Sequence, residues 1–293
     1  MSGPRGLRPP TSPSHRSPPP PMTVRAAPRL NVPLQPWKPP MDELCISKQM
    51  GAEVRFDHIR RCVLKRGNRV RPNEETALRL VKKYTTIPVP EVYDSEYTTK
   101  NRDAYGQIWM QSFGGEELDE IWDDLDDATK ERLCHELWGF VKQLRNIPKP
   151  PELAHLYQCS ADGSACQDVL LEDLTDPPVP ILDDESLRNR INERYLHCNG
   201  ASYRENLLDY LPRSNVSVFT HADMAPRNVM VDPITRKINV LLDWEFAGWY
   251  PDYWEYAKMQ VQWGREDYMR WMEKTRPQDW DIIGIHKAKR VLF

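Results

Sequence analysis

Three side chains suited to acid–base and metal chemistry lie close together in residues 219–232, which read FTHADMAPRNVMVD. His221, Asp223 and Asn228 stand between the apolar run VSVFT and a second apolar run. The first run is typical of a buried strand, so we expect Asp223 at a strand end, where functional loops are commonly placed. A carboxylate there could accept a proton from a substrate hydroxyl. A polar turn capped by an Asx side chain is the alternative.

A further carboxylate, Asp243, ends the apolar segment NVLLD. The segments NVMVD and KINVLLD, joined by PITR, predict a hairpin that returns Asp243 beside Asn228. We expect Asp243 to project from the same end of the same small sheet as Asp223. Carboxylate and amide oxygens suit Mg²⁺, which takes one or two protein carboxylates plus substrate phosphates. One carboxylate that orients a hydroxyl, beside ligands that hold a metal on phosphates, is the arrangement of phosphoryl transfer.

The elements that must position these residues predict an α+β fold. Residues 41–113 are predicted to form a small strand-rich lobe, with strands in AEVRF, RRCVLKRG, EVYDSEY and DAYGQIWMQSF and one helix in NEETALRLVKKY. After Gly114 and Gly115 the pattern becomes helical. Helices are predicted in DDATKERLCHELWGFVKQLRNI, capped by Asp126 or Asp127, and in DDESLRNRINERYL, SYRENLLDYL and PDYWEYAKMQVQW, the last with Pro251 near its first turn.

Residues 1–40 differ in composition from the rest, with thirteen prolines, six Lys or Arg and no acidic residue. Such a segment is predicted to be a disordered tail, or a partner-binding segment for proline-recognising modules. The chain is formally −3 and the tail is +6, so residues 41–293 carry −9. An acidic body argues against nucleic acid as a partner and is weakly compatible with a cationic small substrate.

The sequence also bears on compartment and on metal binding by thiols. It contains no apolar run long enough to cross a membrane and nothing with the pattern of a secretory signal, so we expect a cytoplasmic protein. Its six cysteines are then expected to be free thiols. A zinc site built from His155, Cys159 and Cys166 is disfavoured because their spacing matches no known ligand pattern.

The sequence resembles the aminoglycoside/choline phosphotransferase family, which has a protein-kinase-like two-lobe fold, and in particular its fungal members. FTHADMAPRNVMVD, VLLDWEFAGWYPDYWEYAK and IPVPEVY carry the likeness, which covers roughly residues 45–263. It implies transfer of phosphate from ATP, with Mg²⁺, to a hydroxyl of a small molecule. It also implies a nucleotide-binding lobe over 41–113 and a catalytic, acceptor-binding lobe over 114–293.

By the same resemblance each residue of the opening motif has a role. Asp223 matches the catalytic base, and His221 the residue that braces its loop. Asn228 and Asp243 match the metal ligands. Arg227 could contact phosphate or lie at the surface. The sequence departs from protein kinases after Asp243, because Trp and Glu follow it in place of the Phe and Gly of the kinase motif.

The likeness in the first lobe implies the nucleotide contacts. Lys65 matches the strand lysine that binds phosphates, although a solvated lysine is the alternative. Glu74 matches the helix glutamate that holds this lysine, with Glu75 as the competing choice. The inter-lobe hinge, whose backbone would bond adenine, matches Met110, Gln111, Ser112 and Phe113. Gly51 is the only glycine between Met41 and Lys65, so no glycine-rich phosphate loop is visible. An inactive nucleotide-binding or scaffold protein therefore stays an alternative.

The phosphate acceptor is not identified by the sequence. Six aromatic residues could form a cation–π cage for an amine, but their helical spacing favours core packing: Trp244, Trp249, Tyr250, Tyr253, Trp254 and Tyr256. Glu245, Asp252 and Glu255 could meet a cationic acceptor or be solvated or capping residues. Helices near the C-terminus help to close the acceptor pocket in this family, and the short apolar segment 280–293 leaves that closure in question.

Overall fold

The computed structural model describes residues 43–49, 51–100, 103–175, 177–262 and 264–292. The predictions made for the proline-rich tail over 1–40 lie outside the described residues. The described residues all belong to one compact unit. The boundary between residues 113 and 114 therefore stays a prediction.

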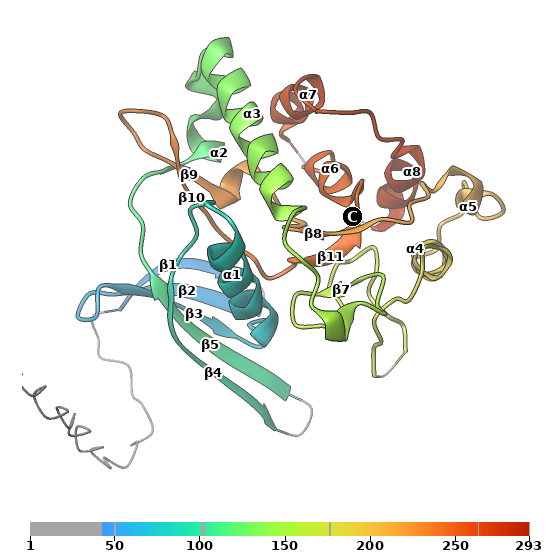
Figure 1. Cartoon of the computed structure of the whole chain (residues 1–293), viewed down its shortest axis with the longest axis horizontal. Coiled ribbons are helices and arrows are strands. Elements are labelled where there is room, and N and C mark those ends of the chain that lie inside the picture. Colours follow the sequence, from blue (N-terminus) through green and yellow to red (C-terminus); the bar gives the residue numbers. More distant parts are fainter. Residues whose placement is uncertain (1–42, 50, 101–102, 176, 263, 293) are drawn as a thin grey trace, which may run out of the picture. The chain divides into compact units, whose positions relative to one another are not determined.

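The N-terminal part of this unit is a five-stranded antiparallel sheet in the order β1-β2-β3-β5-β4 (Figure 1). The four predicted strands are present, and β1 was not predicted. Its apolar residues Leu44, Cys45 and Ile46 follow one another and are all exposed, so the segment lacks the alternation that indicates a strand. The strands are β1 (Glu43–Gln49), β2 (Ala52–Asp57), β3 (Cys62–Gly67), β4 (Val92–Lys100) and β5 (Asp103–Gln111).

Helix α1 (Pro72–Tyr84) follows β3 and packs beside this sheet, as Figure 1 shows. Its apolar residues Ala77, Leu78 and Val81 are buried, as the helical spacing predicts. A proline at its start and two glutamates in its first turn suit the N-terminus of a helix. The first turn of α1 therefore holds Glu74 at a fixed place next to the sheet.

Two small antiparallel sheets carry the predicted site. One has the order β10-β9-β6 and the other β7-β11-β8. The hairpin of β9 and β10 forms as predicted, but Asp223 follows β8 and Asp243 follows β10, so the prediction that one sheet carries both is wrong. The strands are β6 (Glu116–Glu117), β7 (Cys159–Ser160), β8 (Ser217–Thr220), β9 (Val229–Val231), β10 (Ile238–Leu241) and β11 (Gly248–Pro251).

Strand β11 explains why the two carboxylates belong to different sheets. It pairs with β8 from Gly248 opposite Thr220 to Pro251 opposite Ser217. Pro251 was predicted in the first turn of a helix and instead ends this strand. A proline is tolerated there because β7 reaches only as far as Trp249, so no neighbour on that side needs the missing N–H.

The remaining elements are mostly helical. Asp126 caps α3 by accepting a hydrogen bond from the Thr129 N–H, as predicted. The helix predicted over 202–211 is reduced to the short α5, because residues 202–206 form turns instead, and the Tyr203 N–H there donates to the hydroxyl of Tyr195. The elements are α2 (Leu118–Ile121), α3 (Asp127–Leu144), α4 (Asp184–His197), α5 (Leu207–Tyr210), α6 (Trp254–Met259), α7 (Glu266–Lys274) and α8 (Ile283–Leu292), with 3₁₀ turns η1 (Trp122–Asp124), η2 (Pro151–Leu153) and η3 (Pro226–Asn228).

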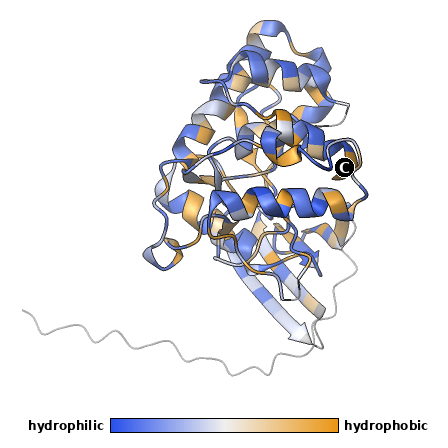
Figure 2. Cartoon of the chain, turned by 90° about the vertical axis from the view of Figure 1, so that its right-hand side faces the viewer, coloured by the Kyte–Doolittle hydropathy of each residue, from blue (hydrophilic) through white to orange (hydrophobic). Residues whose placement is uncertain are grey.

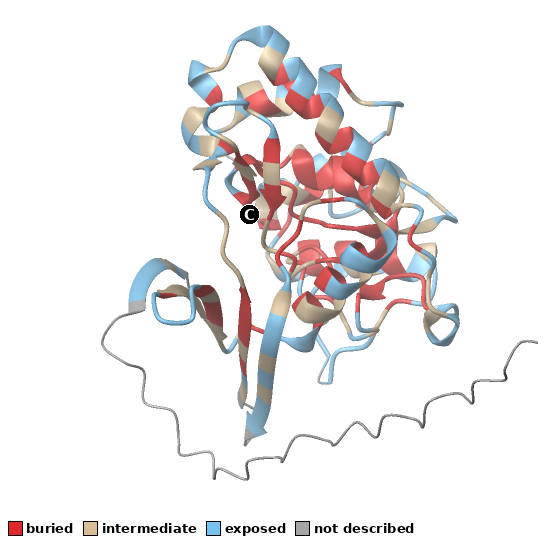
Figure 3. Ribbon diagram, turned by 60° about the vertical axis from the view of Figure 1, so that its left-hand side comes forward, coloured by how far each residue is buried: buried red, intermediate tan, exposed pale blue. Residues whose placement is uncertain are grey.

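The apolar core lies between these helices and the small sheets. Figure 3 shows the buried segments gathered there, and Figure 2 shows helices with one apolar and one polar face. The six aromatic residues considered for an amine cage are all buried, so core packing is confirmed for them. Among the residues that the structure describes, no helix combines the length and the apolar character needed to cross a bilayer.

The pairing of β7 with β11 generates a stability prediction. A Cβ on Gly248 would lie 2.3 Å from the carbonyl oxygen of Cys159, so Gly248→Ala forces these strands apart. We expect a loss of about 1–3 kcal/mol in the free energy of unfolding. Gly139 lies exposed in α3 with nothing near its Cβ position, and Gly139→Ala should instead stabilise by about 1 kcal/mol. Denaturant unfolding measures both; equal effects would contradict the strand geometry.

Candidate active site

The loop after β8 holds Asp223 in a defined conformation. Ala222, just before it, has a φ of 65°, which an L-residue adopts only when its surroundings impose it. The buried ring of His221 accepts a hydrogen bond from the Asp223 N–H at 3.1 Å through Nδ1. Its Nε2 then carries the proton and donates to the Leu242 carbonyl at 3.0 Å. Burial lowers the pKa of His221, which favours this neutral form.

His221 therefore connects the loop of Asp223 to the end of the neighbouring hairpin. Its ring also packs edge-on against Trp244, with ring centroids 4.4 Å apart. These contacts place the predicted bracing residue between the two sheets that carry the predicted base and the predicted metal ligands.

Glu255, in α6, supports the same loop through hydrogen bonds to its backbone. Its carboxylate oxygens accept hydrogen bonds from the His221 N–H at 2.7 Å and the Ala222 N–H at 3.2 Å. The side chain is buried, and burial raises its pKa to about 7 in spite of these bonds. The sequence left Glu255 as an acceptor-binding, solvated or capping residue; its burial contradicts the solvated role, and it does not line the cavity in front of Asp223.

Asn228 and Asp243 lie together at the ends of the hairpin strands. The Leu242 N–H donates to the Asn228 carbonyl at 2.8 Å, and both side chains line one cavity. The Asn228 Nδ2 donates to the backbone carbonyl of Asp223 at 2.8 Å and to its Oδ2 at 2.9 Å. The amide oxygen is thereby left for a ligand. Asp243 has a φ of 60°, a second imposed left-handed conformation at the site.

These residues fit a magnesium ion. An amide oxygen and a carboxylate are hard ligands, and Mg²⁺ is commonly held by few protein groups together with substrate phosphates. Within the described ranges, His, Cys, Asp and Glu do not gather in a set of three or more that could hold a metal ion. An ion held by Asn228 and Asp243 would need further ligands, such as water or phosphate oxygens.

Lys65 lies at the centre of a buried group of carboxylates. Its Nζ is 2.9 Å from Glu74, 2.8 Å from Asp243 and 3.5 Å from Glu245. Burial alone would lower the pKa of Lys65, but the three carboxylates outweigh it and raise the pKa. Burial would likewise raise the pKa of Asp243, and Lys65 turns that into a lowered pKa. The alternative of a solvated lysine is wrong. The competing Glu75 instead bonds Arg79, Ser95 and Tyr97.

A cavity of about 260 Å³ opens beside Lys65, and part of the predicted hinge lines it. Met110, Gln111 and Phe113 line it, whereas Ser112 does not and donates its hydroxyl to the Arg61 carbonyl at 3.4 Å. Met110 pairs with both β3 and β4, so its backbone is engaged in the sheet. Glu117 also lines the cavity and was missed by the sequence, as were the apolar walls formed by Ile46, Val54, Val63, Met230 and Leu242.

The turn between β1 and β2 holds the one glycine that the sequence has between Met41 and Lys65. It contains Gly51, with a φ of 84°, whose carbonyl accepts a hydrogen bond from the Arg69 N–H at 3.0 Å. The side chain of Arg69 bonds Glu245, which in turn lies near Lys65. This end of the turn is therefore tied to the loop before α1, consistent with the missing glycine-rich motif.

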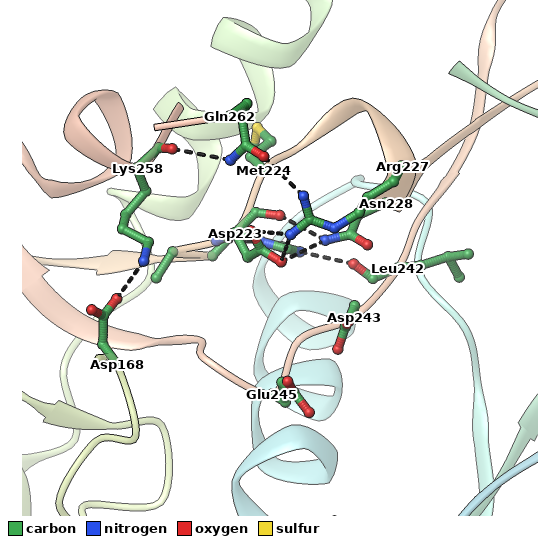
Figure 4. Close-up of polar contacts among 12 residues, drawn as sticks. Asp168, Asp223, Met224, Arg227, Asn228, Leu242, Asp243, Glu245, Lys258 and Gln262 are labelled. Carbon is green, nitrogen blue, oxygen red and sulfur yellow. Dashed lines mark hydrogen bonds and ion pairs between the residues drawn. The ribbon is translucent and has the colours of Figure 1, made fainter. Parts of the chain in front are cut away.

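A second cavity, of about 360 Å³, opens in front of Asp223. Arg227 lines both cavities. Its Nη2 lies 2.7 and 2.6 Å from the two Asp223 oxygens, and its Nη1 donates to the Gln262 Oε1 at 2.8 Å, as Figure 4 shows. Sequence reasoning missed most of this cavity, because its lining comes from distant segments: Asp119, Asp223, Pro226, Arg227, Lys258, Val261, Gln262 and Arg265.

Two further acidic residues have structural partners. Glu245 bonds Lys65 and Arg69, and Asp252 accepts a hydrogen bond from the Ser214 hydroxyl at 2.7 Å. Neither lines the cavity in front of Asp223. Their suggested contact with a cationic acceptor is therefore not supported by their positions.

Comparison with known proteins identifies the family. The sequence profile described as "Phosphotransferase enzyme family" (APH) matches residues 53–278. The chain belongs to this phosphotransferase family. No curated protein matches the chain.

Solved structures show that this member of the family has the protein-kinase-like fold. The GDP and kanamycin complex of APH(2")-IIIa is 17% identical with a TM-score of 0.54, over 86% of this chain and 82% of that one. The ternary complex of an APH(4)-Ia mutant with ADP and hygromycin B is 14% identical with a TM-score of 0.54, over 86% and 84%. The gentamicin–APH(2")-IIa complex is 13% identical with a TM-score of 0.56, over 85% and 81%.

The carboxylates around Lys65 generate a prediction about stability. Lys65→Met leaves several carboxylates buried without their shared cation, so we expect a loss of about 3–5 kcal/mol at pH about 8. Adding Glu74→Gln removes one uncompensated charge and should recover part of the loss. Denaturant unfolding of both single variants and the double variant gives the coupling. Strictly additive effects would mean that Lys65 and Glu74 do not interact.

Glu255 generates a pH prediction. Its pKa is about 7 in the folded protein against 4.5 as the ordinary value. Between pH about 4.5 and about 7 the folded state therefore binds one more proton, on Glu255, than the unfolded state does. The stability that this proton contributes is fully present below pH about 4.5 and is lost as the pH rises through about 7. Glu255→Gln abolishes this effect, so the stability of the wild type relative to the variant should fall by about 3 kcal/mol over that range.

Denaturant unfolding near pH 5 and pH 8 measures this difference. Glu193→Gln, an exposed change in α4, is the matched control. A stability difference between wild type and Glu255→Gln that does not change with pH would show that Glu255 keeps the same charge in both states.

Proposed function

We propose that this protein transfers the γ-phosphoryl group of ATP, with Mg²⁺, to a hydroxyl group of a small molecule. One observation carries the proposal. Asp223 faces one cavity, Lys65, Asn228 and Asp243 face another, and Arg227 lines both. A hydroxyl in the first cavity would meet a phosphate in the second beside Asp223, which is the geometry that in-line transfer needs.

The cavity beside Lys65 would hold the nucleotide. Its apolar wall suits a purine ring, and the backbone of Phe113, which lines the cavity just after β5, would be a source of hydrogen bonds to adenine. Lys65 would contact the phosphates. The structures that share the fold include complexes with GDP, ADP and AMP-PNP, which supports a nucleotide as donor.

Asn228 and Asp243 would hold magnesium on the phosphates. When bound, the ion neutralises charge on the β- and γ-phosphate oxygens. Asn228 also donates to Asp223 through its amide nitrogen, so one side chain would orient both the metal and the base. Lys65 keeps Asp243 ionised, as a metal ligand requires.

Asp223 would act as the base. It accepts the proton of the acceptor hydroxyl as that oxygen bonds the γ-phosphorus, while the bond from this phosphorus to the bridging oxygen of ADP breaks. His221 and Glu255 hold the Asp223 backbone in place for this step. The products are the phosphate ester and ADP, with the proton left on Asp223.

A nucleotide-binding protein without transferase activity is the second candidate. The observation that favours it is the turn at Gly51, tied to the Arg69 backbone in place of a glycine-rich loop. A partner for residues 1–40, the likeness to fungal members and a cytoplasmic location stay predictions from the sequence. A protein kinase is the least supported function, since the segment after Asp243 enters β11 within five residues.

Two substitutions separate these functions. Asp223→Asn should lower phosphorylation of a metabolite mixture by about 10²–10⁴-fold, because it removes the base, while ATP binds within a few-fold of wild type. Asp243→Asn should abolish the magnesium dependence of ATP binding. Labelled ATP reports transfer, and calorimetry reports binding.

Each result points to one candidate. Nucleotide binding with no transfer by wild type would favour the binding protein. Transfer that survives unchanged in Asp223→Asn would remove Asp223 from the mechanism, and wild type that binds no nucleotide would refute both candidates.

A further inference from the structure

The cavity in front of Asp223 is lined by more cationic than anionic side chains. Arg227, Lys258 and Arg265 face it, against Asp119 and Asp223. This balance is opposite in sign to that of residues 41–293, which carry −9. The neighbouring acidic residues Glu120 and Asp123 are not among its lining residues. The charge of the whole chain is therefore a poor guide to this cavity.

The three cations are each paired with a carboxylate, and in each pair the cation is the more exposed partner. The side chain of Arg227 is 47% exposed and that of Asp223 11%. The values are 40% for Arg265 against 21% for Asp119, and 10% for Lys258 against 0% for Asp168. In each pair more of the cationic side chain than of the carboxylate side chain is therefore exposed, and the difference is largest for Arg227.

Arg227 has hydrogen-bonding capacity left for such a ligand. Its bonds to Asp223 and Gln262 use the two terminal nitrogens, so the Nε–H and part of the Nη1 capacity remain. Figure 4 shows its guanidinium held between these two partners. A planar guanidinium fixed in this way is well suited to bind a carboxylate or a phosphate.

A cationic acceptor would find the opposite situation. Asp119 and Asp223 are already bonded by Arg265 and Arg227, so an ammonium group could reach either carboxylate only by displacing an arginine, and it would lie close to that arginine. Like charges in such proximity disfavour binding. The weak expectation of a cationic substrate, drawn from net charge, is not supported by the residues that line this cavity.

We propose that the acceptor is an anionic hydroxyl compound, whose carboxylate or phosphate group is bound by Arg227 and Arg265 with Lys258 beside them. This proposal rests on the proposed function for the identity of the reacting hydroxyl. The donors of Arg227 that would bind the anion lie on the same guanidinium whose Nη2 bonds Asp223.

The test uses four probes that share a six-carbon hydroxylated skeleton: glucose, gluconate, glucose 6-phosphate, and glucosamine at a pH where its amine is protonated. Calorimetry first measures binding of a non-hydrolysable ATP analogue with Mg²⁺ to the full chain, then binding of each probe with and without the analogue. We expect gluconate or glucose 6-phosphate to bind at least about 10-fold more tightly than glucose and glucosamine. Which of the two binds distinguishes carboxylate from phosphate.

Arg265 provides the variant and its control. Arg265→Gln should weaken binding of the anionic probe by about 10- to 100-fold, since a hydrogen-bonded charge is lost, and Arg265→Lys should retain part of it. Arg270, an exposed arginine on α7 outside the cavity, gives the matched Arg270→Gln, which should bind as wild type does. Circular dichroism and melting temperature confirm that each variant is folded.

The results that would contradict this proposal differ from those that would contradict the kinase function. Glucose or glucosamine binding as tightly as the anions, unchanged anion binding in folded Arg265→Gln, or no binding by either anion would each overturn the proposal. Absence of nucleotide binding with anion binding retained would instead refute the kinase function and leave the anion site in place.

Discussion

The ion pairs of Lys65 link the parts of the chain on which the candidate site depends. Lys65 comes from β3, Glu74 from α1, and Asp243 and Glu245 from the segment after β10, so one ammonium group joins the N-terminal sheet, its helix and the hairpin. A buried ion pair of this kind contributes little net stability but is costly to break. The ion pairs therefore join these segments at the wall of the cavity that Lys65, Glu74 and Asp243 line.

Short-range patterns allowed a large part of this arrangement to be predicted. Asn228 and Asp243 could be predicted to lie together because the hairpin that joins them is formed by neighbouring segments of the chain. Helix α1 could be predicted from the spacing of Ala77, Leu78 and Val81. The prediction that one sheet carries Asp223 and Asp243 failed because β8 pairs with β11, a strand that was not recognised in the sequence. Pro251, which ends β11, was predicted in the first turn of a helix. Strands of two to four residues carry too few side chains to show a period.

Residues that act through the backbone, or from distant segments, escaped prediction for a different reason. Glu255 bonds two backbone N–H groups, so no side-chain motif marks its role. The cavity in front of Asp223 combines α2, the loop of Asp223, α6 and the segment that leads into α7. The charges that line this cavity could not be inferred from composition, because they depend on how each charged side chain is paired and how far it is exposed.

The division of the site between two sheets has a consequence for how such a protein can diversify. The residues proposed for metal and phosphate lie on the β9–β10 hairpin and β3, whereas the loop of Asp223 and the acceptor cavity rest on β8, β11 and α6. The two parts are joined by the His221–Leu242 hydrogen bond, by the packing of the His221 ring against Trp244 and by hydrogen bonds from Asn228 to Asp223. A substitution on the acceptor side that shifts the loop of Asp223 would therefore also shift Asn228, so the two halves of the site are expected to diversify together.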